Sequence, residues 1–340
     1  MKQKATSIDI AYRAGVSQAT VSRALRGSKQ VSEETRRRIL EVAAELNYKV
    51  DKNASNLRSQ LCGTLALLFF EDPSPDDSHI NPFLLSMLGS ITRACADQGY
   101  DLLISFQQFS DDWHAEYADS RKADGIILLG YGDYMAYRAK AEKLVAQGTR
   151  FVRWGAVLPD QPDVTVGCDN LSGGQVATEH LLQQGCRRIA FLGSANEHYP
   201  EFFERYHGYT AALKAARIKV DPALQADAES SEESGYAALE ALHAAGIDFD
   251  AVFAASDLIA IGAMRALADH GLNVPADVAV VGFDDISSAN FINPPLTTVR
   301  QDTSRAGALL VDCLLKRING EAAESARLPV SLVVRKSSTR

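Results

Sequence analysis

Long apolar runs are absent from this sequence of 340 residues. The longest, Leu65 to Phe70, has six residues, whereas a helix that crosses a membrane needs about 20. The first residues, MKQKATSIDIAYRAG, contain two lysines but lack the apolar stretch of a secretory signal peptide. We therefore expect a cytoplasmic protein.

Cysteine is also scarce. The five cysteines are odd in number, lie far apart and form no CxxC pair. This pattern argues against a disulfide framework and against a zinc cluster, and it is typical of free thiols in a reducing compartment. We predict no metal site.

The motifs of several enzyme classes are missing as well. No GxGxxG follows an apolar run, and neither GxxxxGK[ST] nor GxSxG occurs. Glu179-His180 reverses the order that a zinc-binding HExxH helix requires. The sequence predicts neither an enzyme nor a cofactor, and an enzyme with an unrecognised motif is the alternative.

Positive charge is concentrated at one end of the chain. Residues 1–60 carry twelve Lys and Arg against six Asp and Glu, while residues 61–340 carry 23 against 37. A basic segment on an acidic body is typical of a segment that binds a polyanion such as nucleic acid. The alternative is a solvated basic helix, because the run Arg36 to Arg38 can simply face water.

The basic segment contains the pattern of two short helices joined by a tight turn, in the stretch SIDIAYRAGVSQATVSRALRG. Ser7 is expected to cap the first helix, and Gly15 to take the positive φ that ends it. Ser17 can cap the second helix by accepting a hydrogen bond from the backbone N–H of Thr20. Ser32 is expected to cap a third helix. This arrangement predicts a helix-turn-helix unit.

The second helix of such a unit enters the major groove of DNA and presents its N-terminal side chains to base edges. Arg23 is suited to bidentate recognition of guanine, and Gln18 to recognition of adenine or to a phosphate contact. The alternative is a three-helix bundle with an incidental polar face. The predicted DNA contacts on this helix are Ser17, Gln18, Ala19, Thr20, Ser22 and Arg23.

Three stretches of the head carry a family resemblance: DIAYRAGVSQATVSRALRG, then VSEETRRRILEVAAELNYK at 31–49 and ASNLRS at 54–59. They resemble the DNA-binding head of the LacI/GalR family of transcriptional regulators. The resemblance implies a hinge that folds on operator DNA, with Leu57 as an apolar wedge in the minor groove; an ordinary linker leucine is the alternative. Two further residues in these stretches are expected to contact DNA, Arg26 and Tyr48. At two positions the sequence departs from the family pattern: Val50 stands where the family usually has proline, and Ser55 where many members have arginine.

From residue 61 onward, apolar runs alternate with helix-length segments. Continuous apolar runs joined by helices are typical of parallel strands that are covered on both faces. The runs form two series, which predicts two doubly wound lobes with a cleft between them. The runs are residues 63–70, 101–106, 125–130 and 150–155 in the first series, and 187–193, 251–256 and 278–283 in the second.

Stretches such as DNLSGGQVATEHLLQQGCRRIAFLG and VPADVAVVGFDD extend the resemblance over residues 61–340. They imply a core that looks like the periplasmic sugar-binding proteins, with a chain that crosses between the lobes three times. The predicted fold is therefore a small all-α helix-turn-helix domain followed by a two-lobed α/β domain with two doubly wound parallel sheets. The predicted boundaries are 1–50 for the head, 51–61 for the hinge and 62–340 for the core, with the first lobe at 62–162 and 297–326 and the second lobe at 163–296 and 327–340.

The resemblance also implies an effector site between the lobes. Arg205 falls on the family's effector-binding arginine and Asp284 on its acidic ligand, and both groups suit hydroxyl or carboxylate partners. Trp154 stands at a strand end where a ring can stack on a sugar. In the alternative reading, Arg205 and Asp284 pair only with each other and the aromatic rings belong to the core. The implied effector-binding residues are Phe83, Gln107, Trp154, Tyr199, Arg205, Ser256 and Asp284.

The sequence thus predicts a sequence-specific transcriptional repressor of carbohydrate-utilisation genes, located with the nucleoid in the cytoplasm. It would bind a palindromic operator as a homodimer and be released by a small sugar. One alternative is a corepressor-dependent regulator on the same scaffold that responds to a purine or a phosphoprotein. Another is a sugar-binding protein without a regulatory role, which would carry a signal peptide and no helix-turn-helix.

Overall fold

The computed structural model describes residues 5–25, 28, 30–46, 48, 61–70, 80–107, 112–130 and 132–339. The chain separates into two compact units, Met1–Cys62 and Gly63–Arg340. This division falls one residue after the predicted start of the core at residue 62, and residues 51–60 of the predicted hinge lie outside the described residues. None of the helices in the described ranges combines the length and the apolar character that a bilayer crossing requires.

The first unit is a bundle of three short helices, α1 (Ser7–Ala14), α2 (Gln18–Leu25) and α3 (Glu33–Glu45). Each helix contributes one fully buried side chain to the core, and these are Ile10, Val21 and Ile39. Gly15 ends α1 with a φ of 65°. The Ser17 hydroxyl accepts the backbone N–H of Thr20 at 3.1 Å at the start of α2. The predicted turn and the predicted cap of α2 are therefore confirmed.

The first helix is capped by Thr6 and not, as predicted, by Ser7. The Thr6 hydroxyl accepts the backbone N–H of Asp9 at 3.4 Å, and the Asp9 carboxylate accepts the backbone N–H of Thr6 at 2.7 Å. This reciprocal capping box needs an acceptor side chain three residues after the cap. A cap at Ser7 would find Ile10 at that position, which has no polar atom to offer, so the helix begins one residue earlier.

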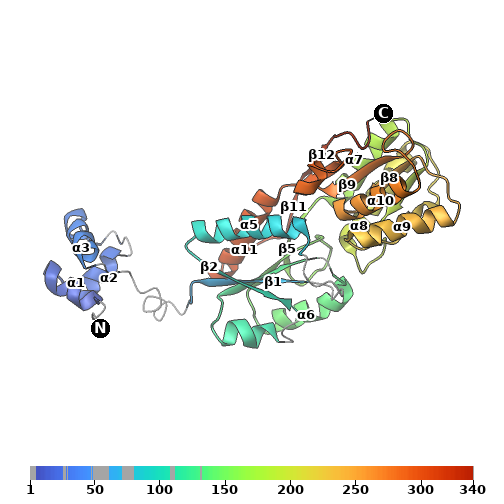
Figure 1. Ribbon diagram of the computed structural model, residues 1–340. Coiled ribbons are helices and arrows are strands. Elements are labelled where there is room, and N and C mark those ends of the chain that lie inside the picture. Colours follow the sequence, from blue (N-terminus) through green and yellow to red (C-terminus); the bar gives the residue numbers. More distant parts are fainter. Residues whose placement is uncertain are drawn as a thin grey trace. The chain divides into compact units, whose positions relative to one another are not determined.

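The second unit contains two six-stranded sheets, one in each lobe (Figure 1). The first sheet consists of β1 (Thr64–Phe69), β2 (Asp101–Phe106), β3 (Gly125–Leu129), β4 (Phe151–Trp154), β5 (Val164–Cys168) and β11 (Ala326–Leu328), and the second of β6 (Ile189–Leu192), β7 (Gln225–Ala226), β8 (Ala251–Ala254), β9 (Ala279–Asp284), β10 (Thr297–Gln301) and β12 (Val330–Val333). The strand orders are β11-β5-β4-β3-β1-β2 and β12-β10-β9-β8-β6-β7. Every pairing in the described core is parallel except that of β10 with β12.

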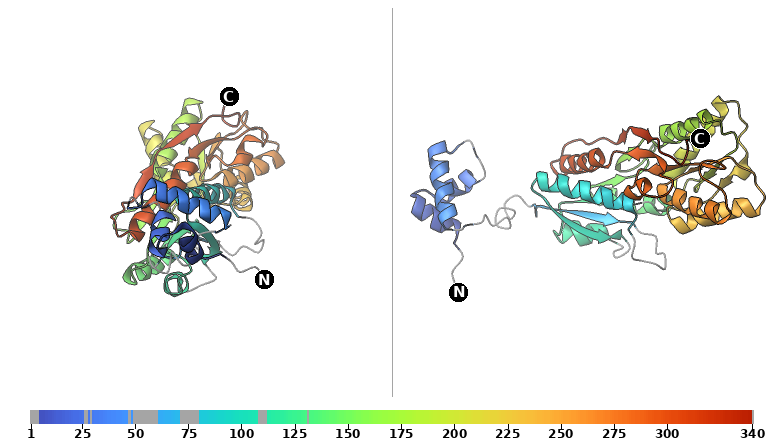
Figure 2. Two further views of the ribbon diagram at one scale, coloured as in Figure 1. Left: turned by 90° about the vertical axis from the view of Figure 1, so that its left-hand side faces the viewer. Right: turned by 45° about the horizontal axis from the view of Figure 1, so that its top comes forward.

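Helices cover both faces of each sheet, which is why the strands are almost continuously apolar (Figures 1 and 2). In the first lobe, α5 and α11 pack together on one face, while α6 and the π-helical turn η2 share a buried cluster with β1, β3 and β4 on the other. In the second lobe, α7 packs with α8 and α9 packs with α10. These elements are α5 (Pro82–Asp97), η2 (His114–Asp119), α6 (Tyr134–Ala146), α7 (Asn170–Gln183), α8 (Pro200–Ala215), α9 (Glu232–Ala244), α10 (Asp257–Asp269) and α11 (Thr303–Ile318), with short 3₁₀ turns η3 (Pro222–Leu224) and η4 (Ser287–Asn290).

The chain crosses between the lobes three times, as predicted, but the lobe boundaries lie a few residues later than those assigned from the sequence. β5 lies in the first sheet although 163–296 was assigned to the second lobe, and β10 lies in the second sheet although 297–326 was assigned to the first. β11, which reaches past residue 326, also stays in the first sheet. β5 and β10 each pair along their length with a strand of their own sheet, and only then does the chain cross to the other lobe. An aspartate then caps the next helix, Asp169 for α7 and Asp302 for α11.

Candidate functional site

One face of α2 presents the side chains that were predicted to read DNA. The opposite face, with Val21 and Ala24, is buried in the core of the head. A helix anchored in this way leaves its polar face available for a groove of DNA. The exposed residues of the predicted set are Ser17, Gln18, Ala19 and Arg23, and the half-buried ones are Thr20 and Ser22.

Gln18 also has a partner inside the head. Its Nε2 donates a hydrogen bond to Ser7 Oγ at 2.9 Å, which links the starts of α1 and α2. To donate to a base or a phosphate, this amide would exchange Ser7 for DNA. Tyr48 is half-buried and packs against the core of the head. Arg26 and Leu57 lie outside the described residues.

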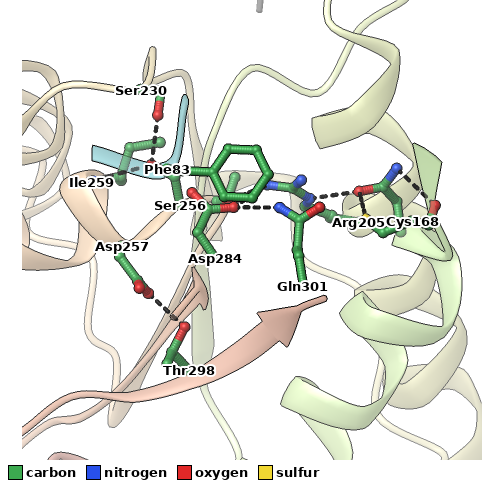
Figure 3. A network of polar contacts seen from close by, with 12 residues as sticks. Phe83, Cys168, Arg205, Ser230, Ser256, Asp257, Ile259, Asp284, Thr298 and Gln301 are labelled. Atoms are coloured by element: carbon green, nitrogen blue, oxygen red, sulfur yellow. Dashed lines mark hydrogen bonds and ion pairs between the residues drawn. The ribbon is translucent and has the colours of Figure 1, made fainter. Parts of the chain in front are cut away.

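Arg205 is the centre of a buried polar cluster in the second lobe (Figure 3). It is 1% exposed, and its guanidinium carbon lies 3.7 Å from the centroid of the Phe283 ring. Its Nε donates to Asn170 Oδ1 at 2.9 Å, and its Nη1 donates to the carbonyl of Ala255. The same Nη1 lies 3.9 Å from Asp284 Oδ1. The guanidinium is therefore held in one orientation beside a carboxylate.

Asp284 ends β9 at the carboxyl edge of the second sheet. Its Oδ1 accepts a hydrogen bond of 2.6 Å from Gln301 Nε2, at the end of the neighbouring β10. Burial raises the pKa of Asp284 to about 7, although Arg205 and Gln301 both favour the charged form. The carboxyl ends of parallel strands are the usual place for ligands in open α/β sheets, so this pair of charges stands where an effector is expected.

Two of the predicted effector contacts are aromatic side chains of the first lobe that pack against each other. Phe83 lies in the first turn of α5, and Trp154 is the last residue of β4. Their ring centroids are 6.0 Å apart, and they are 1% and 2% exposed. The Phe83 ring points toward the hydrogen bond between Asp284 and Gln301 (Figure 3). The two predicted apolar contacts are thus packed against each other, and of the two, the Phe83 ring is the one seen beside the polar cluster.

Ser256 belongs to a chain of polar groups that joins the lobes. Its hydroxyl caps α10 by accepting the backbone N–H of Ile259 at 3.3 Å. It also accepts a hydrogen bond of 3.0 Å from Ser230, whose hydroxyl in turn accepts the Asn81 amide of the first lobe at 3.1 Å. Asn81 caps α5 directly before the segment that carries Phe83.

A second charged network, which was not predicted, joins the lobes. Arg153 Nε donates to Asp163 Oδ2 at 3.1 Å within the first lobe. Glu201, in the first turn of α8, approaches from the second lobe. Its Oε1 accepts the backbone N–H of Ala156 at 2.8 Å and lies 3.9 Å from Arg153 Nη1. Arg153, Glu201 and Gln107 line a cavity of about 30 Å³.

The remaining two predicted effector contacts, Gln107 and Tyr199, bond to groups outside the Arg205–Asp284 cluster. Gln107 faces the cavity beside Arg153, and its Nε2 donates to the carbonyl of Leu68 at 3.1 Å. Tyr199 is half-buried, and its hydroxyl donates to Glu229 Oε1 at 3.2 Å. The structure thus gathers five of the predicted effector contacts where the lobes meet, namely Phe83, Trp154, Arg205, Ser256 and Asp284. Gln107 lines the cavity beside Arg153, and Tyr199 is bonded to Glu229.

Comparisons with known proteins match both units. Residues 7–51 match the model of the lacI family of bacterial regulatory proteins, and residues 178–338 match that of a periplasmic binding protein-like domain. The HTH-type transcriptional regulator CelR of Thermobifida fusca is 33% identical over 336 residues, which cover 96% of each chain. The chain belongs to the LacI family of bacterial regulatory proteins.

Two solved structures extend the match over the whole LacI-family chain. A transcriptional regulator CelR–cellobiose complex has 33% identity and a TM-score of 0.72, covering 98% of this chain and 99% of that one. The lac repressor dimer bound to operator and the anti-inducer ONPF has 26% identity and a TM-score of 0.78, covering 99% of this chain and 100% of that one. These matches confirm the predicted fold and a DNA-binding transcriptional regulator that is not an enzyme.

In this LacI-family regulator, Arg153 was not predicted as a functional residue, although the sequence contains a signal for it. Arg153 interrupts the apolar strand run RFVRWG, and an arginine in a buried strand requires a buried acid nearby. Its partners could not be found in the same way. Asp163 comes from the connection before β5 and Glu201 from the other lobe, so only the folded chain brings them together.

Glutamine in place of Glu201 is expected to loosen the contact between the lobes. The variant keeps an acceptor for the Ala156 N–H but loses the charge that faces Arg153. The difference between a charged and a neutral hydrogen bond is about 1 kcal/mol, which would raise the open population about fivefold. Distances between spin labels at Ala139 on α6 and Ala215 on α8 report this opening, and the exposed Glu197→Gln is the control. An unchanged distance distribution would show that Glu201 does not hold the lobes together.

Proposed function

We propose that this regulator represses carbohydrate-utilisation genes, binding a palindromic operator as a homodimer and leaving it when a small sugar binds between the lobes. The observation that carries the proposal is the buried pair Arg205 and Asp284 beside the ring of Phe83, which packs against Trp154. A guanidinium and a carboxylate can hold sugar hydroxyls through charge-assisted hydrogen bonds, and flat apolar rings suit the faces of a pyranose.

The relatives support the same assignment. The CelR structure is a complex with cellobiose, and the lac repressor structure is a dimer on its operator. Applied to this chain, they favour a sugar effector and a dimer that reads two half-sites. A DNA target implies action at the nucleoid in the cytoplasm. We assign DNA contacts to Ser17, Gln18, Ala19, Thr20, Ser22, Arg23, Arg26 and Tyr48, and the minor-groove wedge to Leu57 in a hinge at residues 51–61.

Sugar binding on this proposal requires the lobes to part and close again. Phe83 and Trp154 are almost fully buried, so a ligand reaches Arg205 and Asp284 only after these rings move apart. A sugar changes operator affinity only if it binds the two arrangements of the lobes with different affinities. The Glu201–Arg153 and Asn81–Ser230 contacts are among those that such a movement breaks.

Operator binding measured with and without sugars tests the proposal. A gel-shift assay with the DNA upstream of the neighbouring genes is combined with a panel that contains cellobiose, ribose and other neutral sugars. We expect at least one sugar to weaken operator binding about tenfold or more, within the usual range of allosteric coupling. An operator affinity that no sugar changes contradicts a sugar-released repressor. Operator binding that appears only with a ligand identifies a corepressor-dependent regulator.

DNA binding is also expected to depend strongly on salt. The basic balance of residues 1–60 implies several phosphate contacts for each head. A dimer with about six to ten such contacts loses about a thousandfold in affinity or more between about 50 and 200 mM salt. Fluorescence anisotropy with the full chain measures this slope, and a chain that begins at Gly63 is the control and should not bind. A flat salt dependence would contradict the phosphate contacts.

A further inference from the structure

The turn that follows β9 has an unusual backbone. Asp284 and Asp285 both have positive φ values, of 120° and 57°. Residues with a side chain seldom adopt this region, and it persists only where the surrounding structure enforces it. Because Asp284 carries the carboxylate that faces Arg205, whatever holds this turn also determines where that carboxylate points.

Asp257, the first residue of α10, lies directly beneath the turn and is fully buried. Its Oδ2 accepts the backbone N–H of Ile286 at 2.9 Å, and its Oδ1 accepts the hydroxyl of Thr298 at 2.5 Å. The Thr298 hydroxyl in turn accepts the backbone N–H of Asp285 at 3.3 Å. Two consecutive amides of the turn are therefore held by one carboxylate, directly or through the Thr298 hydroxyl. Figure 3 shows the contact between Asp257 and Thr298.

Asp257 Oδ1 lies close against the backbone of the neighbouring strand β9. A Cβ at Gly282 of β9 would lie 2.3 Å from Asp257 Oδ1, so the glycine is what allows the carboxylate to reach the turn. On the other side, the Asp285 carboxylate is paired with Arg300 and Arg335, each at 2.6 Å. Of the two adjacent acids, Asp285 is thus committed to these arginines, and Asp284 remains beside Arg205.

We propose that Asp257 and Thr298 are positioning residues that hold the strained Asp284–Asp285 turn and thereby aim the Asp284 carboxylate at the effector. The proposal rests on the proposed function, in which Asp284 is an effector ligand. Neither residue needs to touch the ligand. Their effect on binding passes through the backbone of the turn.

Valine in place of Thr298 is the sharpest test, because it keeps the shape of the side chain and replaces the hydroxyl with a methyl group. The matched control is Thr178→Val on α7 of the same lobe. Thr178 is also fully buried, and its hydroxyl donates to the backbone carbonyl of Gly174 at 2.8 Å. Both variants lose one buried hydroxyl, so both are expected to melt at a somewhat lower temperature. Only Thr298→Val releases the turn.

Two measurements on the protein without ligand separate the variants. In Thr298→Val, hydrogen exchange at the backbone amides of Asp285 and Ile286 is expected to be about tenfold faster or more, because local opening becomes easier. The side-chain carbon resonance of Asp284, which should titrate near pH 7, is expected to shift its midpoint by about one pH unit as the carboxylate moves relative to Arg205, Gln301 and Asp257. Thr178→Val should change neither. Equal behaviour of the two variants would overturn the proposal.

Calorimetry with cellobiose, or with whichever sugar of the panel the wild-type protein binds, completes the test. We expect Thr298→Val to bind that sugar about tenfold more weakly, because one charge-assisted contact between Asp284 and the sugar is lost. Thr178→Val should bind it as the wild type does. An ordinary affinity in Thr298→Val, despite a loosened turn, would also overturn the proposal. If the wild-type protein binds no sugar, the proposed function fails, and the exchange and titration measurements alone decide whether Asp257 and Thr298 aim Asp284.

Discussion

Asparagine in place of Asp284 is expected to abolish the effector response while operator binding stays unchanged. The variant keeps the size of the side chain and an oxygen that can accept the Gln301 amide, but it loses the negative charge. A hydrogen bond to a charged group contributes about 1.5–3 kcal/mol, so effector affinity should fall about 10- to 150-fold. Calorimetry measures this loss, and gel shifts with and without sugar measure the response.

Asp250→Asn is the matched control for this variant. Asp250 precedes β8 at the opposite edge of the same sheet, and its carboxylate accepts the backbone N–H groups of Arg187 and Arg188 at 2.7 and 3.0 Å. The control should lose some stability and keep the full effector response. If Asp284→Asn binds the sugar with wild-type affinity, Asp284 is only a structural partner of Arg205.

A pH dependence follows from the same carboxyl. Burial raises the pKa of Asp284 to about 7 from its ordinary value of 3.8, so the carboxylate form increases as the pH rises through 7. A carboxylate accepts stronger hydrogen bonds from sugar hydroxyls than the neutral acid does. Sugar affinity in the wild type should therefore rise between about pH 6 and 8, and Asp284→Asn should show no such rise. A flat profile in the wild type would contradict a role for the Asp284 charge in sugar binding.

Alanine in place of Arg23 is expected to remove most of the discrimination between operator and random DNA. Arg23 is exposed on α2, and the loss of a bidentate contact with guanine costs about 1–3 kcal/mol per half-site. The head itself should keep its stability within about 0.5 kcal/mol, because the core side chains Val21 and Ala24 lie on the other face. Competition binding with operator and random duplexes measures the effect.

Arg13→Ala provides the comparison for Arg23. Arg13 is an exposed arginine at the end of α1, and its Nη1 lies 3.7 Å from Glu45 Oε2. Its loss removes the same charge, so affinity for all DNA should fall slightly while discrimination remains. If Arg23→Ala retains full discrimination, the reading of sequence lies with Gln18 or with the shape of the DNA.

The sequence by itself determined the head almost completely. Gly15, Ser17 and Ser32 end or cap helices as expected, because each of these interactions closes within a few residues along the chain. The one error, Ser7 in place of Thr6, was an error of a single residue within the same local motif. The side chains of α2 that face outward also follow directly from helical periodicity.

The strands of the core were predictable where both faces are covered by helices, since such strands are apolar runs. The sheets to which β5 and β10 belong could not be predicted in this way. β10 contains Thr297, Thr298 and Gln301, which are polar and yet buried, with side chains that donate hydrogen bonds to other parts of the chain. A local pattern of apolar residues cannot show such a strand, and the lobe boundaries moved accordingly.

The site divides in the same way. The resemblance to a family supplied Arg205, Asp284 and Ser256, while only the tertiary structure brought Glu201 to Arg153 from the other lobe and placed Asp257 beneath the turn after β9. These are contacts between side chains far apart in the sequence. A buried charge is stable only beside its partners, and the partners are chosen by the packing of two lobes and not by neighbouring residues. The sequence therefore determined the helices, most strands and the class of regulator, and the folded chain decided which charges meet.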